Sequence, residues 1–191
     1  MDRVNKKTMR LLDRVVIGLL VLLAMLLAGL QAARAAEIVP SVGLSHATSG
    51  DGGYKTFAGL AVRGGVLPMV KAELGVAYRN DPYLNGDLDV RMWPVTASLW
   101  LTPFPSLYFG GGAGVYHTTY DYNDALPLQD ETSSEFGTHL GGGFTIPIVP
   151  AIASLDLNGR YVHLREKGTL LAPGAIKQSF VTTSLGVSIR F

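Results

Sequence analysis

The chain has 191 residues, 23 of them glycine and none of them cysteine, which excludes disulfides, thiolate nucleophiles and cysteine-ligated metals. The net charge is +1, but six of the 16 basic residues lie within the first 36 positions. Ten basic and thirteen acidic residues follow, a net charge of about −3 that gives no support to nucleic-acid binding. Beyond residue 36, no apolar run approaches the roughly 20 residues that a membrane-spanning helix needs.

The first 35 residues have the order of a secretory signal peptide. Residues 1–14 carry five basic side chains, residues 15–30 are continuously apolar, and Ala33 and Ala35 form a small-residue cleavage site. The sequence therefore predicts cleavage after Ala35 and export of residues 36–191 as one domain. An uncleaved membrane anchor is the alternative, because the apolar core is somewhat long for a signal peptide.

Eight later segments alternate apolar and polar residues with a period of two, which is typical of β-strands with two different faces. The predicted strands are 37–47, 54–63, 69–79, 90–101, 106–118, 133–146, 151–165 and 180–191. Short proline-containing turns are predicted at 64–68, 102–105 and 147–150, and polar loops at 48–53, 80–89, 119–132 and 166–176. Pro94 predicts a bulge or an irregular start in the fourth strand.

Long and short connections alternate strictly along the chain, and no segment shows a helical period. This order describes an antiparallel up-and-down meander, and eight such strands can close into a barrel without a free edge. The predicted fold class is therefore all-β, an eight-stranded antiparallel up-and-down barrel.

One face of each predicted strand is almost purely apolar, and the other mixes charges with glycine and serine. Large apolar side chains would overfill a small lumen, so we expect them to face lipid in a transmembrane barrel; a lipocalin-like soluble barrel is the alternative. The charged face is then predicted to form a salt-bridged plug in the lumen. Its residues are Arg63, Lys71, Glu73, Arg79, Glu135, His139, Asp156 and Arg160. The candidate pairs are Glu73 with Lys71, Arg79 or Arg63, and Asp156 with Arg160.

Aromatic residues on the apolar face support this assignment. If the mature N-terminus lies in the periplasm, the short turns are periplasmic and the polar loops lie outside the cell. Aromatic residues then mark the two borders of the apolar band, as a bilayer favours. The predicted girdles are Tyr78, Trp93, Phe136 and Tyr161 at the outer rim, and Phe109, Phe144 and Phe191 at the inner rim.

Four stretches carry a resemblance to a known family: 107–117, 137–143, 158–162 and 184–191. Together they make residues 37–191 resemble the small eight-stranded bacterial outer-membrane β-barrel family, the OmpA/OmpX-like barrels. The resemblance is specific for architecture and weak for activity. It implies a location in the bacterial outer membrane and contact with its lipid and lipopolysaccharide. It also implies recognition of the C-terminal strand by the outer-membrane assembly machinery, with Phe191 as the assembly signal.

Other motifs give no strong sign of chemistry. The glycine clusters 110–114 and 141–143 lie inside predicted strands, where close backbone approach explains them better than a phosphate loop, which needs a following helix. His46, His117, His139 and His163 form no metal-binding spacing. His163 is followed by Leu-Arg, unlike the His-x-Ser-Asn motif of lipid A deacylases. No calcium-loop spacing occurs among the loop acids Asp81, Asp87, Asp89, Asp121, Asp124, Asp130 and Glu131.

The sequence thus predicts a non-enzymatic integral outer-membrane barrel without a cofactor, with a structural or surface-interaction role through its loops. Tyr54, Tyr83, Tyr120 and Tyr122 are candidate contact residues. The surface ligand stays open among other proteins, lipopolysaccharide and host surfaces. An outer-membrane lipid-modifying enzyme and a minor small-solute pore are the alternatives.

Overall fold

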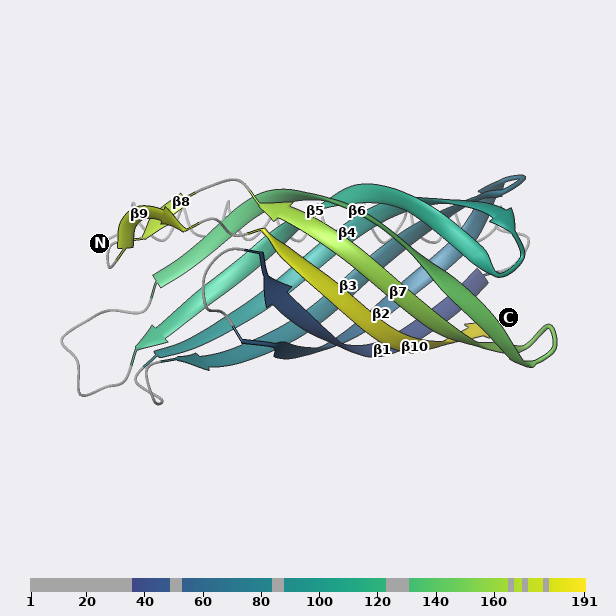
Figure 1. Cartoon of the computed structure of the whole chain (residues 1–191), viewed down its shortest axis with the longest axis horizontal. Helices are drawn as coiled ribbons and strands as arrows, with labels where there is room; N and C mark the ends of the chain where they lie inside the picture. The colour runs from purple at the N-terminus through teal and green to yellow at the C-terminus, as the bar shows by residue number, and fades with distance from the viewer. Residues whose placement is uncertain are drawn as a thin grey trace, which may run out of the picture. The chain divides into compact units, whose positions relative to one another are not determined.

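The computed structural model describes residues 36–48, 53–83, 88–122, 131–164, 167–169, 172–176 and 179–191. Eight antiparallel strands close into a barrel in the order β1-β10-β7-β6-β5-β4-β3-β2 (Figure 1), which confirms the predicted fold class. The barrel strands are β1 (Ala36–Ala47), β2 (Lys55–Leu67), β3 (Val70–Tyr83), β4 (Leu88–Phe104), β5 (Leu107–Tyr122), β6 (Glu131–Val149), β7 (Ala153–Leu164) and β10 (Phe180–Arg190). The described part of the chain has no helix that is long and apolar enough to cross a membrane. The predicted signal peptide, with Ala33 and Ala35, lies outside the described residues.

Several strands extend further than the alternation of side chains predicts. The predicted turn 64–68 is shorter, because β2 continues to Leu67 and the turn consists of Pro68 and Met69. The predicted loops 80–89 and 119–132 both lose their ends to strands, and the predicted loop 166–176 contains a separate two-stranded sheet of β8 (Lys167–Thr169) and β9 (Ala172–Ile176). Backbone hydrogen bonds between strands set these boundaries. The pairing continues through residues that do not follow the alternation of apolar and polar side chains.

The predicted bulge at Pro94 is wrong. Val76 pairs with Val95 and Arg79 pairs with Met92 in one continuous register, with no pair between them. Because proline has no N–H, the ladder is interrupted there without an inserted residue. The register shifts instead lie beside the short turns, at Gly65/Leu67, Leu101/Phe104 and Pro147/Val149.

The register sets the tilt of the strands. One row of paired residues starts at Glu37, crosses all eight strands on the lumen side and returns to β1 at Ala47, ten residues further along. The row is Glu37, Arg63, Glu73, Ser98, Gly112, His139, Val162, Phe180 and Ala47. A barrel of this kind tilts its strands by about 40°, so each strand residue advances about 2.5 Å along the barrel axis. The row therefore spirals along the barrel axis. It begins at the end with the short turns, called the turn end, and finishes at the end with the long loops, called the loop end.

The two faces of each strand are sharply different. On β7, Leu157 is 43% exposed, whereas its neighbours Asp156 and Asn158 are only 3% and 8% exposed. The last strand repeats this order, with Leu185 and Val187 outside. The apolar residues therefore cover the outside of the barrel, as the sequence predicts. Both ends of the barrel chain meet at the turn end, where the Phe191 N–H donates to the Ala36 carbonyl oxygen at 3.1 Å.

Candidate functional site: the barrel lumen

Four charged side chains from three strands form an ion network in the turn-end half of the lumen. From β2, Arg63 donates to Glu73 Oε2 through Nε at 2.9 Å and Nη2 at 2.7 Å, and to Asp156 Oδ2 through Nη1 at 2.9 Å. Arg160 Nη2 donates to the other Glu73 oxygen at 2.8 Å. Arg63, Glu73 and Asp156 are at most 3% exposed. Because buried charges are costly unless paired, this network is the electrostatic centre of the interior.

Polar and aromatic side chains link the ion network to the opposite wall. Tyr108 on β5 donates its hydroxyl to Asp156 Oδ1 at 2.8 Å and accepts from Asn158 Nδ2 at 3.0 Å. The Arg63 guanidinium lies 4.7 Å from the Tyr108 ring centroid, and the Arg160 guanidinium lies 5.1 Å from that of Trp100 on β4. These cation–π contacts extend the network from β2, β3 and β7 to β4 and β5.

Glycines make room for these aromatic rings. Trp100 pairs across the strands with Gly110, and Tyr108 pairs with Gly143. A Cβ atom at Gly143 would lie 2.5 Å from Tyr108 Oη and 2.6 Å from its Cζ. The glycine clusters therefore lie inside β5 and β6. Gly143 leaves space for the Tyr108 ring, whereas a Cβ at Gly110 or Gly112 would meet the backbone of β4, so these two glycines permit close approach of the strands.

A second charged cluster lies at the turn end. Lys71 Nζ and Arg190 Nε both contact Glu37 Oε1, at 2.7 and 3.2 Å, and the Ser188 hydroxyl donates to Glu37 Oε2 at 3.0 Å. The Glu37 side chain is 3% exposed. The predicted plug did not include Glu37 or Arg190. Their inward positions in the alternation of β1 and β10 were the signal that could have identified them.

The observed contacts confirm the candidate pair of Glu73 with Arg63 and correct three others. Lys71 binds Glu37 and not Glu73, and Asp156 binds Arg63 and not Arg160. Arg79 does not reach Glu73; it donates to the Ser45 hydroxyl at 3.0 Å, nearer the loop end. These differences follow from the shear of the barrel, which determines the side chains that meet across the lumen.

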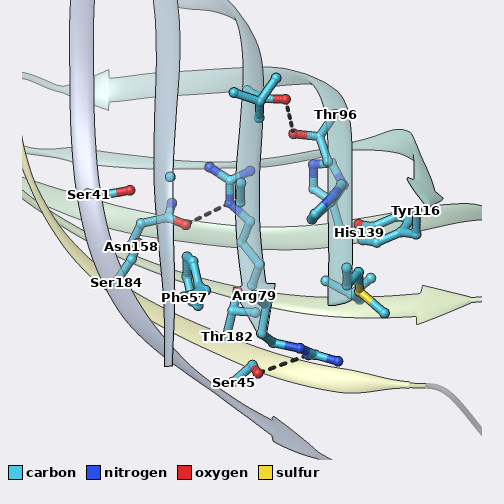
Figure 2. A pocket seen from close by; sticks show the side chains of 18 of the residues that line it. Ser41, Ser45, Phe57, Arg79, Thr96, Tyr116, His139, Asn158, Thr182 and Ser184 are labelled. Atoms are coloured by element: carbon cyan, nitrogen blue, oxygen red, sulfur yellow. Dashed lines mark hydrogen bonds between the residues drawn. The ribbon is translucent and has the colours of Figure 1, made fainter. Parts of the chain in front are cut away.

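A cavity of about 110 Å³ lies between the ion network and the loop end. Figure 2 shows Asn158 and Ser184 on one side of it, and Thr96, His139 and Tyr116 on the other. His139 Nε2 lies 2.9 Å from the Ser98 hydroxyl oxygen. Since a single water needs only about 10–15 Å³ of such volume, the cavity has room for several waters beside its polar walls.

Apolar side chains fill the lumen beyond this cavity. They form a buried cluster, the lumen apolar cluster, of Met92, Tyr116, Val162, Leu164 and Phe180. The Tyr116 and Phe180 rings meet edge to face, with centroids 6.1 Å apart. The sequence prediction missed this cluster, because an apolar residue at an inward position leaves the alternation of inward and outward residues along its strand unchanged.

Glu135 lies outside both charged clusters. It sits near the loop end of β6, where its Oε1 accepts a hydrogen bond from Ser133 at 3.2 Å. Its Oε2 has no hydrogen-bond partner among the described residues. The predicted plug residues therefore do not form one group. Arg63, Glu73, Asp156 and Arg160 form the ion network, Lys71 joins Glu37, His139 lines the cavity, and Arg79 and Glu135 lie nearer the loop end.

Two histidine–serine contacts lie on exposed side chains near the loop end. His117 Nδ1 lies 2.8 Å from Ser134 Oγ, and His163 Nδ1 lies 3.0 Å from Ser179 Oγ. A catalytic triad also needs an acid that orients the imidazole. Within the described ranges, no carboxylate contacts His117 or His163, and no cluster of potential metal ligands occurs.

The predicted girdle residues all lie at outward positions. Toward the loop end, Tyr78 and Trp93 pack with ring centroids 4.4 Å apart, and Phe136 and Tyr161 are exposed. Toward the turn end, Phe109 pairs with Leu101 and Phe144 pairs with Leu107. Phe191 is 69% exposed and lies beyond the end of β10.

A closed barrel with an apolar exterior and a charged interior defines the class of integral membrane β-barrels. The family model described as outer membrane protein beta-barrel domain matches residues 19–191, and the chain belongs to this family. The protein is thus a transmembrane barrel of the bacterial outer membrane.

Solved structures share the fold at low sequence identity. Neisserial surface protein A (NspA) is 14% identical, with 82% of this chain and 96% of that chain covered and a TM-score of 0.61. Ail, the attachment invasion locus protein of Yersinia pestis, is 15% identical, with 82% and 97% covered and a TM-score of 0.57. OprG of Pseudomonas aeruginosa is 16% identical, with 83% and 97% covered and a TM-score of 0.51. Comparison with curated protein sequences finds no match.

Proposed function

We propose that the protein is a non-enzymatic outer-membrane barrel with a closed lumen, which acts through its extracellular loops. The observation that carries this proposal is the presence of two successive barriers in the lumen. The ion network crosses the turn-end half of the lumen, and the lumen apolar cluster crosses it nearer the loop end. A cavity of about 110 Å³ lies between them, and a second cavity of about 370 Å³ lies at the turn end beside Arg63, Lys71 and Arg190.

Both barriers resist opening for physical reasons. An eight-stranded barrel is just wide enough for its interior side chains. Passage of an ion past Arg63 would separate a buried guanidinium from its carboxylates, and breaking such a pair costs about 3–5 kcal/mol. Passage at the loop end would displace Tyr116 and Phe180, which are 2% and 9% exposed.

We propose one orientation of the barrel in the membrane. We place the turn end in the periplasm, where β1 begins and β10 finishes, so that the four longer connections face outside. In this orientation Phe191 lies at the periplasmic end as the proposed signal for the assembly machinery. Its exposure of 69% leaves the ring accessible for recognition. The exterior then contacts phospholipid and, in the outer leaflet, lipopolysaccharide.

The loops are the proposed interaction surface. The crystal structure of Ail is a complex with a heparin analogue, sucrose octasulfate. Here residues 80–89 and 119–132 carry seven acidic residues and no basic residue, so we expect a ligand with cationic groups rather than a sulfated one. The test is binding of the barrel in lipid nanodiscs to immobilised polylysine and to immobilised heparin. Loss of polylysine binding in Asp124→Asn/Asp130→Asn supports the proposal, and preferential heparin binding contradicts it.

Solute flux tests the closed lumen. Proteoliposomes that contain the refolded barrel should swell in glycine or arabinose no faster than protein-free vesicles. A general porin in matched vesicles is the positive control. Swelling that increases with the amount of barrel would refute closure and favour the small-solute pore.

The histidine–serine contacts support one second candidate, a lipid-modifying enzyme at the outer rim. Ser134 and Ser179 each lie within hydrogen-bond distance of an imidazole, as a nucleophile requires. Mass spectrometry of lipid A from cells with and without the protein decides between the two functions. The barrel proposed here leaves the acyl pattern unchanged, and loss of an acyl chain that requires Ser134 or Ser179 would establish the enzyme.

A further inference from the structure

The lumen contains a large cavity at the turn end. This cavity of about 370 Å³, the turn-end cavity, lies between the short turns and the ion network, and Arg63 and Tyr108 of that network line it. Its volume falls within the range of roughly 300–1,000 Å³ of pockets that bind small molecules. Two side chains of its wall, Lys71 and Arg190, are 28% and 34% exposed, so the cavity is reached from solvent.

The wall of the turn-end cavity has an excess of positive charge. Lys71 on β3 and Arg190 on β10 both contact one oxygen, Glu37 Oε1, at 2.7 and 3.2 Å. The Glu37 side chain is 3% exposed and lies behind these two cations, and among the described residues no acidic side chain lines the cavity. Arg63 is balanced by the carboxylates of the ion network. Two wall cations thus share a single carboxylate, and a recess with such walls attracts anions.

Side-chain donors beside the cavity outnumber their acceptors. In the described part of the chain, Lys71 Nζ is hydrogen-bonded only to Glu37, and the Arg190 guanidinium only through Nε to the same carboxylate. Trp100 also lines the cavity, and its buried Nε1–H has no hydrogen-bond partner among the described residues. Unsatisfied donors in a recess favour a ligand that brings several acceptor oxygens.

Hydrogen bonds hold the opposite wall in place. The Thr102 N–H donates to the Met69 carbonyl oxygen at 2.8 Å and so connects two of the short turns. The Thr145 N–H donates to the Ser106 carbonyl oxygen at 2.8 Å, and the Thr145 hydroxyl donates to the Pro105 carbonyl oxygen at 3.2 Å. The cavity is therefore preformed, and a preformed pocket loses little binding free energy to the ordering of its walls.

We propose that the turn-end cavity binds a small soluble compound that carries a phosphate group. A phosphate monoester has a charge of about −1.5 to −2 at neutral pH, and arginine pairs with two of its oxygens at once. Lys71 and Arg190 lie close enough to hold one phosphate together, because both reach the same Glu37 oxygen. The apolar wall residues Phe104 and Leu107 suit the organic part of such a ligand.

A soluble ligand is favoured over a lipid headgroup because both cations belong to the inward face of their strands, together with Glu73 and Ser188. Entry from the periplasm rests on the orientation proposed above, whereas binding does not depend on it.

The chain has only two tryptophans, which makes Trp100 a specific probe of the cavity. The barrel is labelled with ¹⁵N-tryptophan, refolded in an uncharged maltoside detergent without phospholipid, and titrated with inorganic phosphate. The Trp100 indole signal in the NMR spectrum should shift and saturate, whereas the signal of the exposed Trp93 should stay unchanged. The variant Trp93→Phe assigns the two signals. Sodium acetate and sodium chloride at matched ionic strength are the comparison anions and should bind more weakly.

Charge variants should change the affinity in opposite directions. Lys71→Gln and Arg190→Gln should each weaken phosphate binding about tenfold or more, because each removes a charge-assisted contact. Glu37→Gln should tighten binding several-fold, since it removes the carboxylate that competes for both cations, and loss of folding cannot produce such a gain. Arg91→Gln is the matched control, because Arg91 pairs with Asp121 near the loop end, and it should bind phosphate like the wild type.

Three results would overturn the proposal. They are the absence of a saturable shift, equal effects of phosphate, acetate and chloride, and unchanged affinity in both Lys71→Gln and Arg190→Gln. A Trp100 signal that is already fully shifted in phosphatidylglycerol nanodiscs without added phosphate would identify a lipid headgroup as the occupant and overturn the soluble ligand. None of these measurements depends on solute flux, so the closed lumen proposed above is tested separately.

Discussion

Replacement of Glu73 by glutamine removes the central charge of the ion network with almost no change in shape. The Glu73 carboxylate accepts two hydrogen bonds from Arg63 and one from Arg160. In Glu73→Gln, Asp156 is the single carboxylate left in the network, and it contacts Arg63 but not Arg160. Arg63 is 2% exposed, so water cannot solvate the uncompensated charge.

The magnitude follows from this burial. Hydrogen bonds to charged groups contribute about 1.5–3 kcal/mol each, but such values are not additive within one network. Removal of one partner from a buried ion pair costs about 3–5 kcal/mol in all. We therefore expect Glu73→Gln to lower the free energy of unfolding by about 3–5 kcal/mol.

Reversible urea unfolding in detergent micelles measures this effect. Trp93 and Trp100 are built-in fluorescence probes, and Trp100 contacts the network directly. Glu135→Gln is the matched control, because Glu135 also faces the lumen but its side chain is hydrogen-bonded only to Ser133 among the described residues. The control should lose no more than about 1 kcal/mol. Equal losses in the two variants, both below about 1 kcal/mol, would refute the reasoning that the ion network stabilises the barrel.

Three further predictions concern the exterior, the packing and the fold. Leu157→Arg should destabilise the barrel by about 2–4 kcal/mol in lipid, because it places a charge at mid-depth on the lipid face. Gly53→Arg is the control and should have no effect on stability. Equal stability of the two variants would contradict the assignment of Leu157 to the lipid-facing side of its strand. Gly143→Ala should cost about 1–3 kcal/mol in the same urea assay, because its Cβ would meet both the Leu157 carbonyl oxygen and the Tyr108 ring. Gly159→Ala should be neutral, since the nearest atom to its Cβ would be 3.9 Å away. The opposite order would refute the packing argument. The protein should fractionate with outer membranes and migrate differently on gels before and after boiling, whereas recovery as a soluble periplasmic protein would contradict the barrel.

The strand pattern was predictable because each outward face meets one uniform environment. Leu157, Leu185 and Val187 follow the period of two, and a one-residue error would move all of them into the lumen. Strand ends were less predictable, since Leu67 and Tyr122 belong to strands through backbone pairing alone. Pro94 interrupts the ladder without a bulge, because its missing N–H removes a hydrogen bond but inserts no residue.

The lumen was predictable in composition but not in contacts. Inward charges such as Arg63 and Glu73 follow from alternation, and their adjacency follows only from the register. Asp156 reaches Arg63 across the lumen, which depends on the shear of all eight strands. The lumen apolar cluster was not predicted. Its members, such as Val162 and Phe180, occupy inward positions that alternate with outward ones, and nothing in this alternation separates an apolar inward residue from a polar one.

Single-channel recording in planar bilayers tests the closed lumen most directly. The wild-type barrel should give no steady conductance steps, and Tyr116→Ala/Phe180→Ala should also stay silent, because the ion network still closes the turn-end half. Addition of Arg63→Ala and Glu73→Ala to that variant should produce conductance, since both barriers are then removed. Steady, uniform steps from the wild-type barrel would contradict the account.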